Sequence, residues 1–235
     1  MPRIVDLTCP LETTYRTRQY PTISYKTYIS PLFTVLRDGR DVTEFRLTTH
    51  SNTHVDAPRH IFDGGKPLDA LPLESFYGDA VVLDIPKGEL GEISAADLER
   101  EAPDLPEGMI VLLHTGWGKY FWSEPKHAEY LAAHHPGLIE DAGDWLADHK
   151  VKAVGIDCFA IRHPSLSPSL SYEQKKAGAP RPVEPVHHRL LSQDIVILEQ
   201  LMNLEEVKSR NCIASFFPLP FLGVDGSPVR AVAIV

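Results

Sequence analysis

Cysteine is scarce in this chain of 235 residues, which contains only three: Cys9, Cys158 and Cys212. An odd number of cysteines at such wide spacing is neither a disulfide framework nor a cysteine-type zinc site. We interpret them as reduced, mostly buried thiols. The N-terminal residues also lack the apolar segment of a secretory signal. Both observations predict a cytoplasmic enzyme.

Long apolar runs and basic clusters are also missing. No apolar stretch approaches the ~18 residues that a membrane helix needs. The formal net charge is −9, and no five consecutive residues are Lys or Arg. Nucleic acids and anionic membrane surfaces are bound through basic patches, so we expect neither as a main partner. A small-molecule substrate is the expected partner instead.

Short apolar runs alternate with helical patterns along the chain. The predicted strands are 81–85, 109–114, 151–156 and 194–199. The predicted helices are 94–100, 136–149 and 185–192. This alternation predicts an α/β core with parallel strands, in one domain over residues 1–235. The first sixty residues favour antiparallel ribbon or loop. Segment 163–185 has no period and is expected to be a surface excursion or lid.

The chemically most informative segment is the one between His50 and His60. His50, His54, Asp56 and His60 all occupy even positions. In an extended chain every second side chain points to the same face, so the first three would converge. A helix would separate Asp56 from His54 by roughly 200°, and Pro58 also disfavours one. Imidazole and carboxylate groups are ligands for zinc and manganese, so the segment predicts a divalent metal site.

Further ligands are expected from a second part of the chain. The candidates are His187 or His188, on a predicted short helix, and Glu199. Glu199 ends one face of the otherwise apolar predicted strand 194–199, and α/β folds often place functional groups at the carboxyl ends of strands. Each of these residues, taken alone, fits a structural or solvent-facing role better than a functional one. The spacing by itself leaves the choice between the two histidines open.

The segment resembles the signature of the cyclase-like metal-dependent hydrolases, a family that includes bacterial kynurenine formamidase and isatin hydrolase. The match is His50-x-x-Thr53-His54-x-Asp56-Ala57-Pro58-x-His60. Shorter resemblances extend over most of the chain, at Val5–Thr8, His114–Trp117, Gly155–Cys158, His187–Glu199 and Asp225–Ala231. The chain departs from the family pattern at Asn52, where glycine is usual, and at Cys158, where threonine is common.

The resemblance implies a swivelling β/β/α single-domain fold with a mixed sheet. It implies hydrolysis of an amide-type C–N bond, as in an aryl formamide or a lactam, by metal-activated water. One or two Zn²⁺ or Mn²⁺ ions and a homodimer or homotetramer are implied as well. The implied ligands are His50, His54 and Asp56 for one ion, and Asp56, His187 and Glu199 for a second. His60 would be the acid and base, and His187 is preferred to His188 because it precedes Glu199 by twelve residues.

The substrate contacts are weakly indicated. Tyr25 and Phe62 are candidates for the wall of an aryl pocket, although isolated aromatics of this kind are more often core residues. Arg59 and Arg162 are candidates for binding a carboxylate. None of the four belongs to a pattern that fixes its role.

Two alternatives to a hydrolase stay open at this point. His54-x-Asp56 with a distant histidine is similar to the two-His-one-carboxylate triad of non-haem iron oxygenases. The additional His50 and His60, and the alternating α/β pattern, argue against that class. The second alternative is a non-catalytic metal-binding protein, in which His60 would be replaceable without consequence.

Overall fold

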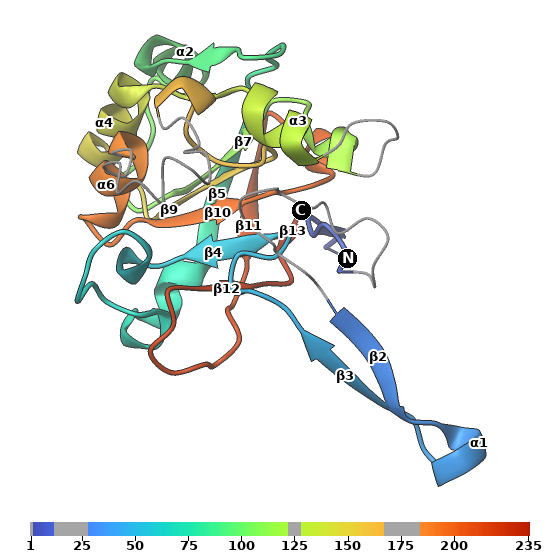
Figure 1. The fold of residues 1–235 in the computed structure, drawn as a ribbon. Coiled ribbons are helices and arrows are strands. Elements are labelled where there is room, and N and C mark those ends of the chain that lie inside the picture. Colours follow the sequence, from blue (N-terminus) through green and yellow to red (C-terminus); the bar gives the residue numbers. More distant parts are fainter. Residues whose placement is uncertain (1, 12–27, 122–127, 167–183) are drawn as a thin grey trace.

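The structure is a computed structural model that describes residues 2–11, 28–121, 128–166 and 184–235. Within these residues the largest element is a nine-stranded mixed sheet (Figure 1). From edge to edge it runs β1 (Ile4–Asp6), β13 (Val232–Ile234), β11 (Arg210–Ser215), β5 (Tyr77–Asp84), β7 (Ile110–His114), β9 (Ala153–Ile156), β10 (Val196–Glu199), β4 (His54–Asp56) and β12 (Gly226–Pro228).

The centre of the sheet is formed by the four strands that the sequence predicted. Strands β5, β7, β9 and β10 pair in parallel, which confirms the predicted α/β core. The outer strands all pair antiparallel, and β1 pairs with β13. The first and last described strands therefore form one edge of the sheet, while β4 and β12 form the other.

Helices cover one face of the sheet (Figure 1). They are α2 (Ala95–Glu101), α4 (Glu140–Asp148) and α6 (Pro185–Leu191), with α3 (Ala128–His134) nearby. Side chains alternate between two buried clusters: Val111 and Leu113 of β7 pack on the helical side, while Ile110 and Leu112 pack on the other. This alternation is what the two-residue period of a strand buried on both faces produces.

The helix predicted over 136–149 is shorter than expected. Its first residues form β8 (Gly137–Leu138), which pairs in parallel with β6 (Glu92–Ile93). A side chain at Gly137 would lie 2.4 Å from the carbonyl oxygen of Arg162, so the backbone here packs too closely for another residue. The helix α4 begins only at Glu140, after this paired strand and the extended residue Ile139. By contrast, α2 begins as predicted, with a capping box between Ser94 and Asp97.

The first sixty residues contain the expected antiparallel ribbon. Strands β2 (Tyr28–Phe33) and β3 (Val42–Arg46) form a hairpin that projects from the body of the molecule, with α1 (Val35–Asp38) at its tip (Figure 1). Short 3-10 helices connect other elements: η1 (Pro58–His60), η2 (Leu68–Ala70), η3 (Leu73–Phe76), η4 (Gly118–Phe121), η5 (Pro164–Leu166) and η6 (Leu204–Glu206).

Two expectations concern parts of the chain that the structure leaves undescribed. Most of the predicted excursion over 163–185 lies outside the described residues, which resume at Glu184. Tyr25 lies outside them as well. In the described part of the chain, no helix combines the length and apolar character needed to cross a membrane.

Candidate metal centre

Two neighbouring strands bring three of the predicted ligands onto one face. Strand β4 pairs antiparallel with β10, with Glu199 directly opposite His54 and Ile197 opposite Asp56. Opposite residues in such a pair point to the same side, as do residues two apart in one strand. The register of the sheet therefore gathers His54, Asp56 and Glu199, all of which are buried.

His50 also joins this group of side chains, but it does so from a turn and not from the extended strand that the sequence predicted. Residues 50–53 form a turn, with Asn52 at φ 54°, and the strand begins only at His54. The expectation of an extended 50–56 therefore fails for its first half. The imidazole of His50 packs over Gly226 of β12, where a Cβ would lie 2.9 Å from His50 Cε1. Glycine at this position is what permits the close approach.

His60 also arrives through a turn, in η1. Pro58 was expected to push Ala57 to extended geometry, and Ala57 is indeed extended, with φ −101° and ψ 163°; Pro58 itself occupies the first position of this 3-10 helix. Proline is tolerated there because the first N–H groups of a helix have no internal partner. The turn places the His60 ring 4.1 Å from that of His50, centroid to centroid.

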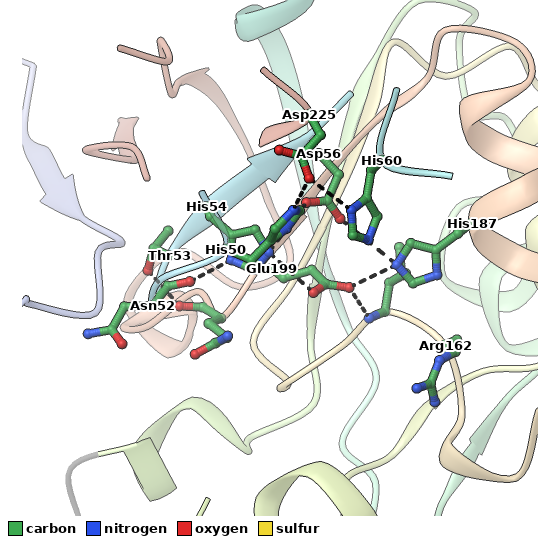
Figure 2. A network of polar contacts seen from close by, with 12 residues as sticks. His50, Asn52, Thr53, His54, Asp56, His60, Arg162, His187, Glu199 and Asp225 are labelled. Atoms are coloured by element: carbon green, nitrogen blue, oxygen red, sulfur yellow. Dashed lines mark hydrogen bonds and ion pairs between the residues drawn. The ribbon is translucent and has the colours of Figure 1, made fainter. Parts of the chain in front are cut away.

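Three overlapping groups of metal-ligating side chains result, and the ligand atoms within each group lie within 4.8 Å of one another (Figure 2). The groups are His50–His54–Asp56, Asp56–His187–Glu199 and His50–His60–Asp225. Asp56 belongs to the first two, which share it as a bridge. Its Oδ1 is 2.8 Å from His50 Nδ1 and 3.4 Å from His54 Nε2, and its Oδ2 is 3.9 Å from His187 Nε2.

The donor set fits a divalent cation. Both carboxylate oxygens of Asp56 are buried, and in the described part of the chain neither accepts a hydrogen bond of good geometry, although Oδ1 is in ion-pair contact with His50 Nδ1 at 2.8 Å. His54 Nδ1 lies 2.7 Å from the carbonyl oxygen of Asn52, to which it donates. Its Nε2 therefore faces Asp56 and Glu199, at 3.4 and 3.6 Å. A bare lone pair that faces two buried carboxylates is unfavourable, so this nitrogen needs either a proton or a metal cation between it and them.

When no metal is bound, protons on the imidazoles balance the negative charges of the carboxylates in this cluster. Burial would lower the pKa of His50, but attraction to Asp56 and Asp225 outweighs it and raises this pKa to about 10. Burial likewise opposes the effect of Glu184 and Glu199 on His187, whose pKa rises to about 10. Burial would raise the pKa of Asp56, but the surrounding histidines hold it well below its usual value. A cation would displace protons from these imidazoles.

Asp225 is a residue whose role the sequence reasoning missed. Its Oδ2 lies 2.8 Å from His50 Nε2 and 3.4 Å from His60 Nδ1. Hydrogen bonds from these two histidines hold its pKa far below the usual range. Asp225 precedes β12, which pairs with β4, so it reaches the cluster through sheet pairing over 165 residues of sequence separation. Asp225 begins a segment that resembles the family, Asp225–Ala231, but nothing local to that segment assigns its carboxylate to the histidine cluster.

The aromatic and basic candidates lie at the margin of the cluster or away from it. Phe62 packs against the helical core and meets His188 edge-to-face, with centroids 4.9 Å apart. His188 is exposed, whereas His187 points inward. Arg59 is exposed. Arg162 is mostly buried, with its Nε 3.1 Å from a carboxylate oxygen of Glu184.

The motifs 114–117 and 155–158 meet beside the site. The buried carboxylate of Asp157 accepts hydrogen bonds from the backbone N–H groups of Thr115, Gly116 and Gly118 and from the Thr115 hydroxyl. It thus fixes the turn that follows β7. Their role in the structure is to shape the carboxyl ends of β7 and β9.

Comparison with known proteins decides the family. Residues 5–163 match the model of the family described as "Putative cyclase". The chain belongs to this cyclase family. The kynurenine formamidase of Bordetella avium is 31% identical over 193 residues, which are 82% of this chain and 79% of that protein. Cyclase-like protein 3 of Oryza sativa is 30% identical over 200 residues, 82% of this chain, and the chain spans only 65% of that relative's length.

The fold is shared with solved structures. Isatin hydrolase A from Ralstonia solanacearum matches with a TM-score of 0.81 and 24% identity, over 100% of this chain and 92% of that one. This likeness confirms the predicted swivelling α/β fold with a mixed sheet.

Proposed function

We propose that the protein is a metal-dependent hydrolase that cleaves an amide-type C–N bond, such as that of an aryl formamide or a lactam. The observation that carries the proposal is buried Asp56, whose two oxygens lie among three imidazoles and belong to both groups of potential metal ligands. Membership of the cyclase family supports it, because members of that family include proteins named kynurenine formamidase and isatin hydrolase.

His50, His54 and Asp56 would hold one ion, and Asp56, His187 and Glu199 a second. Nitrogen and carboxylate ligands suit both Zn²⁺ and Mn²⁺, and we propose either of these as the ion. When bound, such an ion polarises a carbonyl oxygen and lowers the pKa of a bound water from 15.7 to about 7. The shared Asp56 is the group that would keep two ions close together.

His60 is the proposed acid and base. Its side chain is 29% exposed, so it is open to the solvent side of the cluster. If Nδ1 donates to Asp225, at 3.4 Å, the Nε2 lone pair is left to take a proton from the attacking water. His60 then returns that proton to the leaving nitrogen. Asp225 would stabilise the charged imidazole, as a carboxylate beside a catalytic histidine does.

The test is hydrolysis of N-formylkynurenine and isatin by metal-stripped protein, with Zn²⁺ or Mn²⁺ added back. Turnover that returns with the metal would establish an amidohydrolase and separate the formamide from the lactam as substrate. Tight metal binding without turnover of either compound would contradict the proposed substrate class. Turnover that needs O₂ and Fe²⁺ would contradict hydrolysis itself.

We also propose that the protein is a cytoplasmic homodimer or homotetramer. The projecting hairpin supports assembly, because it exposes large apolar side chains, which on a monomer are an aggregation risk. These are Leu32, Val35, Leu36 and Phe45. The three buried free thiols suit a reducing compartment. Light scattering coupled to gel filtration tests the assembly, and a monomer at micromolar concentration would contradict it.

A further inference from the structure

His187 has a carboxylate beside each of its ring nitrogens. Its Nε2 is 3.3 Å from Glu199 Oε1, on the side of the proposed ion. Its Nδ1 is 3.0 Å from Oε2 of Glu184, the residue that precedes helix α6. An ionised carboxylate can only accept, so Glu184 favours the tautomer with the proton on Nδ1. That tautomer leaves the Nε2 lone pair available to an ion.

Arg162 contacts the same carboxylate of Glu184 that approaches His187. Its Nε lies 3.1 Å from Glu184 Oε2, the same oxygen that approaches His187. The next residue back, Ile161, donates its backbone N–H to Glu199 Oε1 at 2.8 Å. Two consecutive residues therefore contact the two carboxylates that flank His187, and Figure 2 labels Arg162 on the same side of the cluster as His187.

The groups beside Nδ1 of His187 and Nδ1 of His54 differ in charge. His54 Nδ1 faces the neutral carbonyl of Asn52, whereas His187 Nδ1 faces a carboxylate. A carboxylate makes the imidazole a stronger base and a better ligand than a carbonyl does. A carboxylate that is mostly buried needs a counter-charge, which Arg162 supplies: the two side chains are 26% and 15% exposed.

We propose that Glu184 and Arg162 are a positioning pair that orients His187 and sets the affinity of the Asp56–His187–Glu199 site for its ion. This inference rests on the proposed function, because it requires that an ion binds there. The pair acts through His187 and touches neither the ion nor the substrate. It therefore affects one of the two proposed ions and leaves the one at His50 and His54 unchanged.

The experiment is a chelator-competition titration of Zn²⁺ into metal-stripped wild type, Glu184→Gln and Arg162→Gln. Loss of such an outer partner typically weakens metal binding 10–100-fold. In Glu184→Gln we expect this loss of affinity for the ion at Asp56, His187 and Glu199, and in Arg162→Gln a smaller loss for the same ion. The affinity for the ion at His50 and His54 should change by no more than about twofold. In the Zn²⁺-loaded wild type, ¹⁵N spectra should also show a protonated Nδ1 on His187 that becomes exposed to exchange in Glu184→Gln.

The matched control is Glu89→Gln. Glu89 pairs with Nδ1 of His134 at 2.6 Å, on the surface and outside the three ligand groups. The substitution therefore removes a similar carboxylate–histidine pair without affecting an ion. Unchanged affinity for both ions in Glu184→Gln, or an equal drop for both, would overturn the positioning role while leaving the proposed function in place. A wild type that binds no divalent ion would overturn the proposed function and this inference with it.

Discussion

The outer and inner parts of the histidine–carboxylate cluster differ in burial. The outer part is His50, His60 and Asp225, with side chains 12%, 29% and 38% exposed. The inner part is Asp56, His187 and Glu199, with side chains 1%, 4% and 8% exposed. Burial strengthens the attraction between a carboxylate and a cation, because less water screens the charges. Proton transfer, by contrast, needs contact with water and substrate. The difference teaches that the inner part suits an ion, whereas His60 and Asp225 of the outer part suit proton transfer and His50 lies between the two roles.

Asp56→Asn should have the largest effect, because Asp56 belongs to both proposed ion sites. The neutral amide removes the shared negative charge that the three imidazoles surround. We expect the metal content of purified protein to fall to background and turnover to disappear. Elemental analysis and a hydrolysis assay measure both. Full metal content in this variant would mean that the ion is held elsewhere.

His60→Gln comes next and separates the outer from the inner part. We expect turnover to fall ~10²–10⁴-fold, the usual contribution of a general acid–base residue. The metal content should stay at the wild-type level, since His60 lies outside the two proposed ligand sets. His134→Gln, at an exposed histidine, is the control and should leave turnover unchanged. An unaltered rate in His60→Gln would remove the proton-transfer role.

The pH dependence tests a property that the two parts share. His50 and His187 both have a pKa of about 10 in the folded, metal-free protein, against 6.5 in the unfolded chain. Groups whose pKa is raised by folding stabilise the protein fully below pH 6.5, and this contribution is lost as the pH rises towards 10. The Tm of metal-stripped protein should therefore fall over this window.

Added Zn²⁺ should reverse that trend, because ligands must lose protons before they bind metal. The metal-induced rise in Tm should be larger at pH 8.5 than at pH 6. Thermal melts with chelator and with Zn²⁺ across the window make the comparison. A Tm of metal-stripped protein that stays flat between pH 6.5 and 10 would contradict the charge arrangement.

Asn52→Gly should have the smallest effect. Glycine adopts the φ of 54° without steric cost, but the substitution loses the hydrogen bond from Asn52 Nδ2 to the Pro10 carbonyl. These effects oppose each other, so we expect the free energy of unfolding to change by about 1 kcal/mol or less. Asn52→Val, which suits a positive φ poorly, should cost more. Chemical denaturation measures both, and an equal loss in the two variants would refute the backbone argument.

The sequence predicted best what depends on local pattern. The four central strands follow from their apolar runs, and the side of the sheet shared by His54 and Asp56 follows from the two-residue period. His50 and His60 lie in the cluster although they arrive through turns, whose shape depends on Gly226 packing and on η1. Asp225 and Glu184 could not be assigned, because their roles arise from sheet pairing and from contacts across the fold.

The most direct test of the account is a crystal structure of Zn²⁺-loaded protein, with anomalous scattering used to locate the metal. The account predicts a peak in contact with Asp56, bound by His187 Nε2 and Glu199, or by His50 and His54, or two peaks that share Asp56. Anomalous density that lies away from Asp56, in a crystal whose protein hydrolyses its substrate, would contradict it.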